Sequence, residues 1–179
     1  MKREAALPDG SALCVGCGMC CDGTLFDRIG VTAEEQVRLR VLGFSLLRYE
    51  GEMVFEQPCR SDDCGSCLIY EARPAVCRRF RCGLLQAYQS GAISLDAAKS
   101  KQDKARELIA AVAADDPAAV RNGPRHKLRL QLAEQMQAGG PETRRVLARR
   151  FLNVIALDSY LERWFRAKEK PFSAAQTPG

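Results

Sequence analysis

The sequence predicts an α-rich α+β fold in which an irregular cysteine-rich lobe with a short hairpin precedes a helical C-terminal region of about three helices. All nine cysteines of the 179-residue chain lie between residues 14 and 82. Residues 83 to 179 contain none and follow helical periodicity. With 46% hydrophobic residues, the chain can bury one core of ordinary domain size. We therefore expect a cysteine domain over 1–92, a helical extension packed on it over 93–170, and a flexible tail over 171–179.

Little regular structure is predicted around the cysteines. The segment 14–23, CVGCGMCCDG, is too rich in glycine and cysteine for a helix or a strand. After it, Thr32 and Glu35 have the spacing of a capping box, which predicts a helix that Gly43 can close. Residues 59–82 return to loops and short turns.

The hairpin is predicted over residues 44–57, FSLLRYEGEMVFEQ. Apolar residues alternate on both sides of Glu50-Gly51, and such a pair suits a two-residue hairpin turn. Pro58 then ends the second strand because proline cannot donate a backbone hydrogen bond. A brief helix is expected over 84–89.

Three longer helices are predicted after residue 93. The first runs from Ser94, with apolar residues every three or four positions, until Asp115-Asp116-Pro117 interrupts the pattern. The second spans about 125 to 138 and stops at Gly139-Gly140. The third starts with Pro141 in its first turn and runs to about Lys168 along a broad apolar face.

The composition predicts a cytoplasmic protein with reduced thiols. No stretch approaches the roughly 20 consecutive apolar residues that a membrane-spanning helix needs. The beginning, MKREAALPDGSALC, contains no apolar core of signal-peptide length. Reducing compartments disfavour structural disulfides, nine is an odd number, and the adjacent Cys20 and Cys21 are too close for an ordinary bridge. The cysteines are therefore interpreted as metal ligands or reactive thiols.

The first cysteine cluster is Cys14-x-x-Cys17-Gly-x-Cys20-Cys21. Two intervening residues allow a tight turn that points both sulfurs at one ion about 2.3 Å away, and glycine permits the backbone conformation that this turn needs. Four thiols within eight residues can complete one tetrahedral site, or they can be shared between two neighbouring ions.

The second cluster contains Cys59, then Cys64-Gly-Ser-Cys67, then Cys77 and Cys82. Again a CxxC pair is followed by single thiols at short intervals, which favours a metal site. Buried unliganded cysteine explains one or two such residues well, but it does not explain nine of them within one short region.

These motifs resemble the YkgJ-like CxxCxxCC cysteine-cluster family, which is described as a zinc- or iron-chelating domain. The resemblance rests on the first cluster, on Cys59, and on the later string CLIYEARPAVCRRF, and it covers about residues 14 to 82. It implies that the metal ligands are Cys14, Cys17, Cys20, Cys21, Cys59, Cys67 and Cys77, with Cys82 as an eighth. Cys64 departs from the family pattern and is either a non-ligating thiol or a substitute for Cys82. Within the motif, Tyr70, Arg73 and Arg78 are expected to donate hydrogen bonds around the sulfurs.

Eight thiols match two four-thiolate sites for zinc or iron ions, or two iron–sulfur clusters as the alternative. The predicted function is a metal-binding protein with a structural, storage, delivery or sensing role. Two alternatives stay open: an iron–sulfur enzyme or redox protein, and a metal-stabilised adaptor for nucleic acid or a protein partner. The helical extension is the expected surface for a protein partner.

No catalytic residue is assigned. The single histidine, His126, falls on a predicted helix far from the cysteines and gives no hydrolytic triad. The stretch from Arg121 to Lys170 contains twelve basic and five acidic residues, and the two signs are interspersed along it. Such mixing is typical of a solvated helix surface and makes nucleic acid a disfavoured partner.

Overall fold

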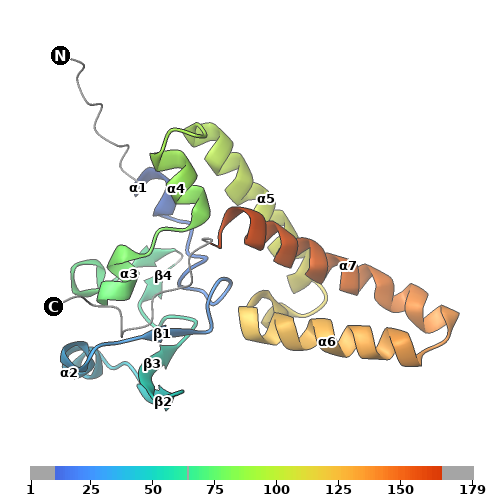
Figure 1. Cartoon of the computed structure of the whole chain (residues 1–179), viewed down its shortest axis with the longest axis horizontal. Coiled ribbons are helices and arrows are strands. Elements are labelled where there is room, and N and C mark those ends of the chain that lie inside the picture. The colour runs from blue at the N-terminus through green and yellow to red at the C-terminus, as the bar shows by residue number, and fades with distance from the viewer. Residues whose placement is uncertain (1–10, 64, 167–179) are drawn as a thin grey trace.

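Short elements make up the first half of the chain and long helices the second, as the computed structural model in Figure 1 shows. It describes residues 11–63 and 65–166. The predicted α-rich α+β class, with a hairpin region before a helical C-terminal part, is confirmed. The elements before residue 90 are α1 (Ser11–Cys14), β1 (Arg28–Gly30), α2 (Ala33–Val41), β2 (Leu47–Tyr49), β3 (Glu52–Glu56), β4 (Asp62–Asp63), β5 (Ser66–Cys67), the 3₁₀ turn η1 (Tyr70–Ala72), α3 (Ala75–Arg79) and α4 (Gly83–Gln89).

The predicted hairpin is confirmed as β2 and β3, with Glu50 and Gly51 at its turn. Both turn residues have positive φ, 49° and 87°, as a two-residue hairpin turn requires. The structure adds β1, which pairs antiparallel with β3 and places Ile29 opposite Phe55. A small apolar core covers this sheet and consists of Ile29, Val31, Leu39, Phe44 and Phe55.

Helix α2 starts at the predicted capping box. The Thr32 side chain accepts from the Glu35 N–H at 3.4 Å, and the Thr32 N–H donates to Glu35 Oε2 at 3.0 Å. The second carboxylate oxygen of Glu35 accepts from the Ala75 N–H at 2.6 Å, at the start of α3. One buried carboxylate therefore joins the α2 cap to the helix that carries Cys77.

Three long helices form the second half: α5 (Leu95–Ala113), α6 (Asn122–Ala138) and α7 (Pro141–Trp164), with the 3₁₀ turn η2 (Pro117–Val120) before α6. Helix α5 begins after the Ser94 cap, as predicted. Two boundaries differ from the prediction. Helix α6 begins three residues earlier because the Asp27 carboxylate accepts from the Asn122 side chain and the Gly123 N–H in its first turn. Helix α7 ends four residues earlier, at Trp164, where the Phe165 carbonyl accepts from the Gly83 N–H. The predicted tail over 171–179 lies outside the described residues.

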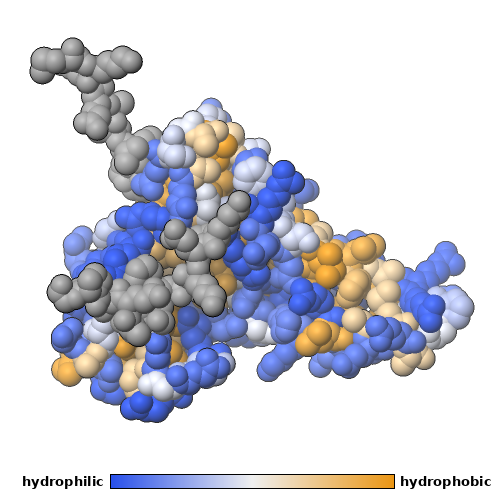
Figure 2. Space-filling view, in the orientation of Figure 1, coloured by the Kyte–Doolittle hydropathy of each residue, from blue (hydrophilic) through white to orange (hydrophobic). Residues whose placement is uncertain are grey.

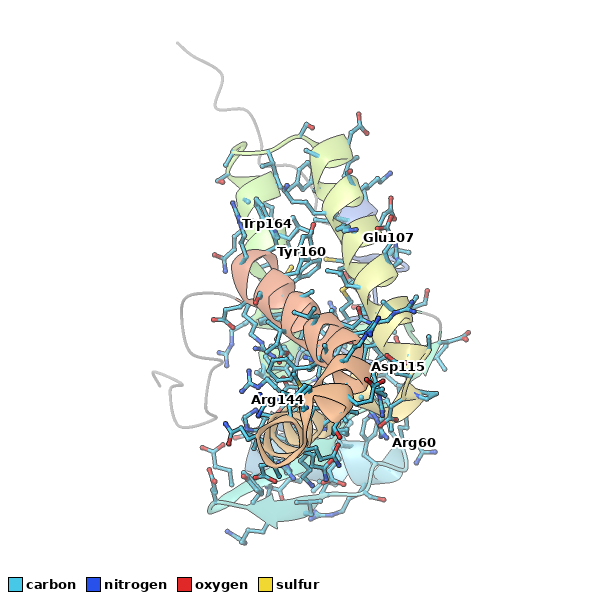
Figure 3. All side chains as sticks on the ribbon, turned by 90° about the vertical axis from the view of Figure 1, so that its right-hand side faces the viewer. Arg60, Glu107, Asp115, Arg144, Tyr160 and Trp164 are labelled. Carbon is cyan, nitrogen blue, oxygen red and sulfur yellow. The ribbon has the colours of Figure 1, made fainter. Side chains whose placement is uncertain are left out.

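The main core joins the long helices to the cysteine loops. Helix α7 packs against both α5 and α6, and Figure 3 shows Tyr160 and Trp164 along α7 beside α5. The Lys101 ammonium of α5 lies 3.7 Å from the centroid of the Trp164 ring. Residues of the first cysteine loop enter the same core as residues of the helices: Leu13, Met19, Leu25, Leu84, Ala105, Val112, Leu157, Leu161 and Phe165. The loop is thus held by helix packing.

The α6–α7 hairpin extends away from the sheet. Figure 2 shows apolar surface over it, and Leu130, Val146 and Leu152 are each at least half exposed there. Within the described part of the chain, no helix combines the length and the apolar character that crossing a membrane requires.

Candidate metal centre

The loop that carries the first four cysteines is folded by tight turns. The Cys17 N–H donates to the Cys14 carbonyl at 3.0 Å, and the Cys21 N–H donates to the Gly18 carbonyl at 2.6 Å. Gly16 and Gly18 have φ of 78° and 71°, a left-handed conformation that favours glycine. The glycines between the cysteines are therefore a backbone requirement of this loop.

Backbone contacts join this loop to the later cysteines. The Cys59 N–H donates to the Cys21 carbonyl at 2.7 Å, and the Gly16 N–H donates to the Gly65 carbonyl at 3.2 Å. The approach at Gly65 is so close that a Cβ there would lie 2.7 Å from the Gly16 carbonyl carbon. The two cysteine clusters, about 40 residues apart in sequence, thus form one site region.

One set of thiols, which we call the first group, consists of Cys14, Cys17, Cys20 and Cys82. The hydrogen bond with Cys21 and burial raise the pKa of Cys20 most, and the charges of Cys17 and Cys82 add to the rise. The charges of Cys17 and Cys14 contribute to the rise of the Cys82 pKa to about 11. The largest contribution for Cys82 is burial. The first group therefore brings together α1, the following loop and the start of α4.

The second group consists of Cys21, Cys59, Cys67 and Cys77. Burial and then the thiols of Cys21, Cys59 and Cys67 raise the pKa of Cys77 to about 12. Cys21 and Cys67 likewise raise the pKa of Cys59, after the larger effect of its burial. These four residues come from four different segments, and only the fold brings them together.

Packing supports the same division. Cys17, Cys20 and Cys82 pack against the main core formed with the helices. Cys59 and Cys77 pack against the small core of the sheet instead. The adjacent Cys20 and Cys21 have their sulfurs 3.8 Å apart and lie where the two groups meet. The group boundary therefore falls between two consecutive residues.

Backbone N–H groups are arranged to stabilise thiolates. In Cys17, Cys59 and Cys67, a hydrogen bond from the N–H two residues further along lowers the thiol pKa, against the larger raising effect of burial. The Cys82 sulfur caps α4 and accepts from the Leu85 N–H at 3.4 Å. Donors of this kind favour the ionised sulfur that binds metal.

The donors fit zinc or iron in kind, because both metals bind cysteine thiolates. Their placement is looser than in a metal complex. Among residues 11–63 and 65–166, no three Cys, His, Asp or Glu side chains converge closely enough to hold an ion as they stand. Binding an ion therefore requires the thiols of a group to rotate toward one another, which is the usual coupling between metal binding and local ordering.

A cationic side chain lies beside the second group. The Arg73 guanidinium lies 3.7 Å from the Tyr70 ring centroid, and its charge lowers the pKa of Cys21, Cys67 and Cys77 against larger raising effects at Cys67 and Cys77. In Cys21 the larger cause of the lowered pKa is the hydrogen bond with Cys20. The Arg78 side chain is exposed on α3. Of the motif residues expected around the sulfurs, Arg73 thus acts on the second group by charge, with Tyr70 stacked against it.

Several residues near the thiols were not predicted from the sequence. On α5, the Gln102 side chain donates to the Leu13 carbonyl at 2.6 Å and also hydrogen-bonds the Cys17 thiol. Arg106 donates to the Gly16 carbonyl at 2.8 Å. Gln102 is a polar residue between Ala98 and Ala105 on the buried face of α5. A polar residue at such an apolar position is the sequence signal that could have identified it. Cys64 lies outside the described residues, and none of the eight described cysteines forms a disulfide.

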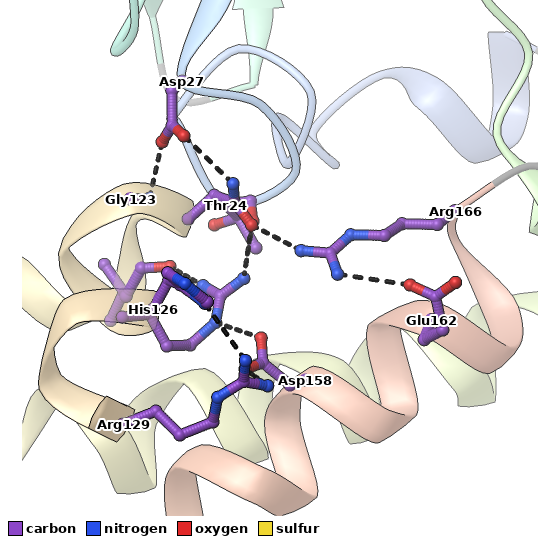
Figure 4. A network of polar contacts seen from close by, with 11 residues as sticks. Thr24, Asp27, Gly123, His126, Arg129, Asp158, Glu162 and Arg166 are labelled. Carbon is purple, nitrogen blue, oxygen red and sulfur yellow. Dashed lines mark hydrogen bonds and ion pairs between the residues drawn. The ribbon is translucent and has the colours of Figure 1, made fainter. Parts of the chain in front are cut away.

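A buried polar network holds the chain just beyond Cys21, as Figure 4 shows. Arg125, at the start of α6, donates to the Thr24 carbonyl at 3.0 Å and to the Asp158 carboxylate on α7 at 2.7 Å. The Asn122 N–H donates to the Gly23 carbonyl at 2.8 Å. The last two helices thereby fix the backbone that follows the Cys20-Cys21 pair.

Comparison with known proteins gives one match. A family model described as "CxxCxxCC: Putative zinc- or iron-chelating domain" matches residues 13–106, which is more than half of the chain. The matched segment contains both thiol groups and the side chains of Gln102 and Arg106, and it ends before α6. No curated protein and no solved structure matches the chain.

Proposed function

Because this chain belongs to the CxxCxxCC family, whose domain is described as zinc- or iron-chelating, we propose that it binds two metal ions, one in each thiol group. The observation that carries this proposal is the division of eight thiols into two groups of four. A four-thiolate set is a complete coordination sphere for zinc and also suits iron. When bound, each ion would supply a cross-link between segments that are distant in sequence.

The two groups suit different roles. In the first group, Cys14 is exposed, but Cys17, Cys20 and Cys82 pack against the main core of the helices, which suits a structural ion. In the second group, Cys59 and Cys67 are less buried and lie on short loop elements. This difference supports storage or delivery of an ion at the second group.

The metal content of the purified protein tests the proposal. The protein is prepared anaerobically without chelator, and zinc, iron and acid-labile sulfide are measured per chain together with the visible spectrum. Two ions without sulfide are expected. Iron with stoichiometric sulfide would replace the two ions by iron–sulfur clusters on the same cysteines. Absence of both metals at stoichiometric level would overturn the proposed function.

Paired substitutions test the division into groups. Cys17→Ser with Cys82→Ser removes two ligands from the first group only, so one ion is expected to remain. Cys17→Ser with Cys77→Ser removes one ligand from each group and is expected to reduce both. The two double variants carry the same number of substitutions and therefore control for each other. Equal metal contents in the two variants would contradict the division.

A further inference from the structure

The carboxylate of Asp62 lies among the ligands of the second group. Asp62 follows Cys59 in a tight turn, where its N–H donates to the Cys59 carbonyl at 3.0 Å. In the β4–β5 pair, Asp62 is directly opposite Cys67. The backbone thus places this acidic residue next to two thiols that come from different segments.

The Asp62 side chain has an unused donor atom. Its Oδ1 is buried and has no hydrogen-bond partner within the described residues. An unpaired carboxylate oxygen in such a place is costly unless another group binds it. The pKa of Cys21 is lowered by its hydrogen bond with Cys20, and the Asp62 charge opposes that lowering. Burial raises the pKa of Cys59 and Cys67 most, and the Asp62 charge adds to the rise, so the carboxylate lies near three of the four thiols of the second group.

Neighbouring carboxylates are arranged differently. Asp22 follows Cys21, but its Oδ1 accepts from the Thr24 N–H at 2.7 Å and thereby stabilises the local turn. Asp63 is exposed. The Gly65 backbone N–H also hydrogen-bonds the Asp62 carboxylate. Asp62 is distinguished from Asp22 and Asp63 by its buried Oδ1, which has no hydrogen-bond partner among the described residues.

We propose that Asp62 supplies an additional, exchangeable donor to the second group, and that ions enter and leave the protein there. The inference rests on the proposed function. The Asp62 oxygen would hold the ion together with the remaining thiolates while one thiolate departs, since zinc can expand from four to five ligands. The negative carboxylate would also attract an arriving dication.

The surroundings of the second group suit exchange. Cys67 lies on the two-residue strand β5, and the next residues toward the surface include Leu68 and Tyr70, which are 69% and 56% exposed. In the first group, Cys17, Cys20 and Cys82 pack against the main core, while Cys14 is exposed and its neighbour Val15 is 69% exposed. Both groups therefore have a side near solvent, and the Asp62 carboxylate is what distinguishes the second group.

Zinc release to a chelator tests this proposal. Wild-type protein loaded with two zinc ions is mixed with excess 4-(2-pyridylazo)resorcinol, and the half-time for release of the first equivalent is measured. Asp62→Asn is expected to lengthen that half-time by about tenfold, which corresponds to about 1.4 kcal/mol in the barrier to release, because the departing thiolate then has no carboxylate to replace it. Asp63→Asn is the matched control and should leave it unchanged. Asp62→Glu keeps a carboxylate and should restore release to near the wild-type rate.

The outcomes separate this inference from the proposed function. An unchanged or shorter half-time in Asp62→Asn overturns the role of Asp62, although two bound zinc ions would leave the proposed function intact. If Asp62→Asn fails to hold the second zinc while Asp62→Glu holds it, Asp62 is a permanent ligand and not an exchange donor, and the inference is overturned. Loss in both variants identifies a structural role and overturns the inference. A wild-type protein that binds no zinc or iron refutes the proposed function itself.

Discussion

Arg125 and Asp158 form an ion pair with 2.7 Å between Nε and Oδ1, and the Arg125 side chain is completely inaccessible to solvent. The pair joins α6 to α7, while another guanidinium nitrogen of Arg125 donates to the carbonyl of Thr24. A buried charge is tolerated because its hydrogen-bond donors are engaged. The helices beyond the family match are thus connected to the loop that carries Cys20 and Cys21.

Replacing Arg125 by alanine is expected to lower the free energy of unfolding by about 3 to 5 kcal/mol, because Asp158 then loses its main partner in a largely buried place. Urea unfolding followed by circular dichroism measures this. Lys127→Ala changes an exposed residue on the same helix and should leave stability unchanged. Similar stabilities of Arg125→Ala and wild type would show that the network contributes little.

Gly65→Ala is expected to be more harmful than Gly91→Ala. Both glycines have positive φ, 83° and 75°, but only at Gly65 would the added Cβ meet backbone, at 2.7 Å from Gly16. The unfavourable conformation costs about 1 to 2 kcal/mol in both variants, and overpacking at Gly65 adds about 1 to 3 kcal/mol. Denaturant unfolding and zinc content should both show the difference. Equal effects of the two variants would show that the close backbone approach of Gly65 to Gly16 contributes nothing to stability or to zinc binding.

Removing the metal is expected to loosen residues 59–82 more than the long helices. Strands β4 and β5 have two residues each and α3 has five, so few buried apolar contacts hold them. Helices α5 and α7 keep buried residues such as Val112 and Leu157 in the main core. Hydrogen exchange of loaded and chelator-treated protein, analysed by segment, measures the effect. Uniformly faster exchange along the chain would contradict it.

Zinc binding at neutral pH is expected to release about four protons per ion, because metal binds the thiolate form of each cysteine. Burial holds the thiols of Cys77 and Cys82 protonated in the metal-free protein, with pKa values of about 12 and 11. Affinity should therefore rise with pH and fall in acid. Calorimetry in buffers of different ionisation enthalpy counts the protons. Release near zero would show that the thiolates are already formed without metal.

The helical half was largely predictable because its signals are local. The Ser94 cap, the interruption at Asp115-Asp116-Pro117 and the apolar periodicity depend on neighbouring residues only. The start of α6 was not predicted, since Asn-Gly-Pro is typical of a turn. A helix can begin there because its first N–H groups need no intrahelical acceptor, and the distant Asp27 supplies one.

The site was predictable in its residue types but not in its arrangement. Sequence spacing places Cys20 and Cys21 in one cluster and leaves open whether its thiols serve one ion or two, whereas packing and electrostatics place the two residues in different groups. That division depends on contacts with Cys82 and Cys77, which lie about 60 residues away. Asp62 was missed because an acidic pair in a loop is typical of an exposed surface. The strand register opposite Cys67 and the buried Oδ1 distinguish it from Asp63.

The carbonyls along the first cysteine loop accept hydrogen bonds from outside the loop. The Leu13 carbonyl accepts from the Gln102 side chain, and the Gly16 carbonyl accepts from the Arg106 side chain. The Cys20 carbonyl accepts from the Gln57 side chain, and the Cys21 carbonyl accepts from the Cys59 N–H. The folded chain therefore bears the conformational entropy cost of ordering this backbone, which amounts to about 1 to 2 kcal/mol per residue. An arriving ion has mainly to restrict the single side-chain torsion of each cysteine. A short peptide with the sequence CVGCGMCC lacks this preorganisation and has to supply all of that ordering from the metal bond itself.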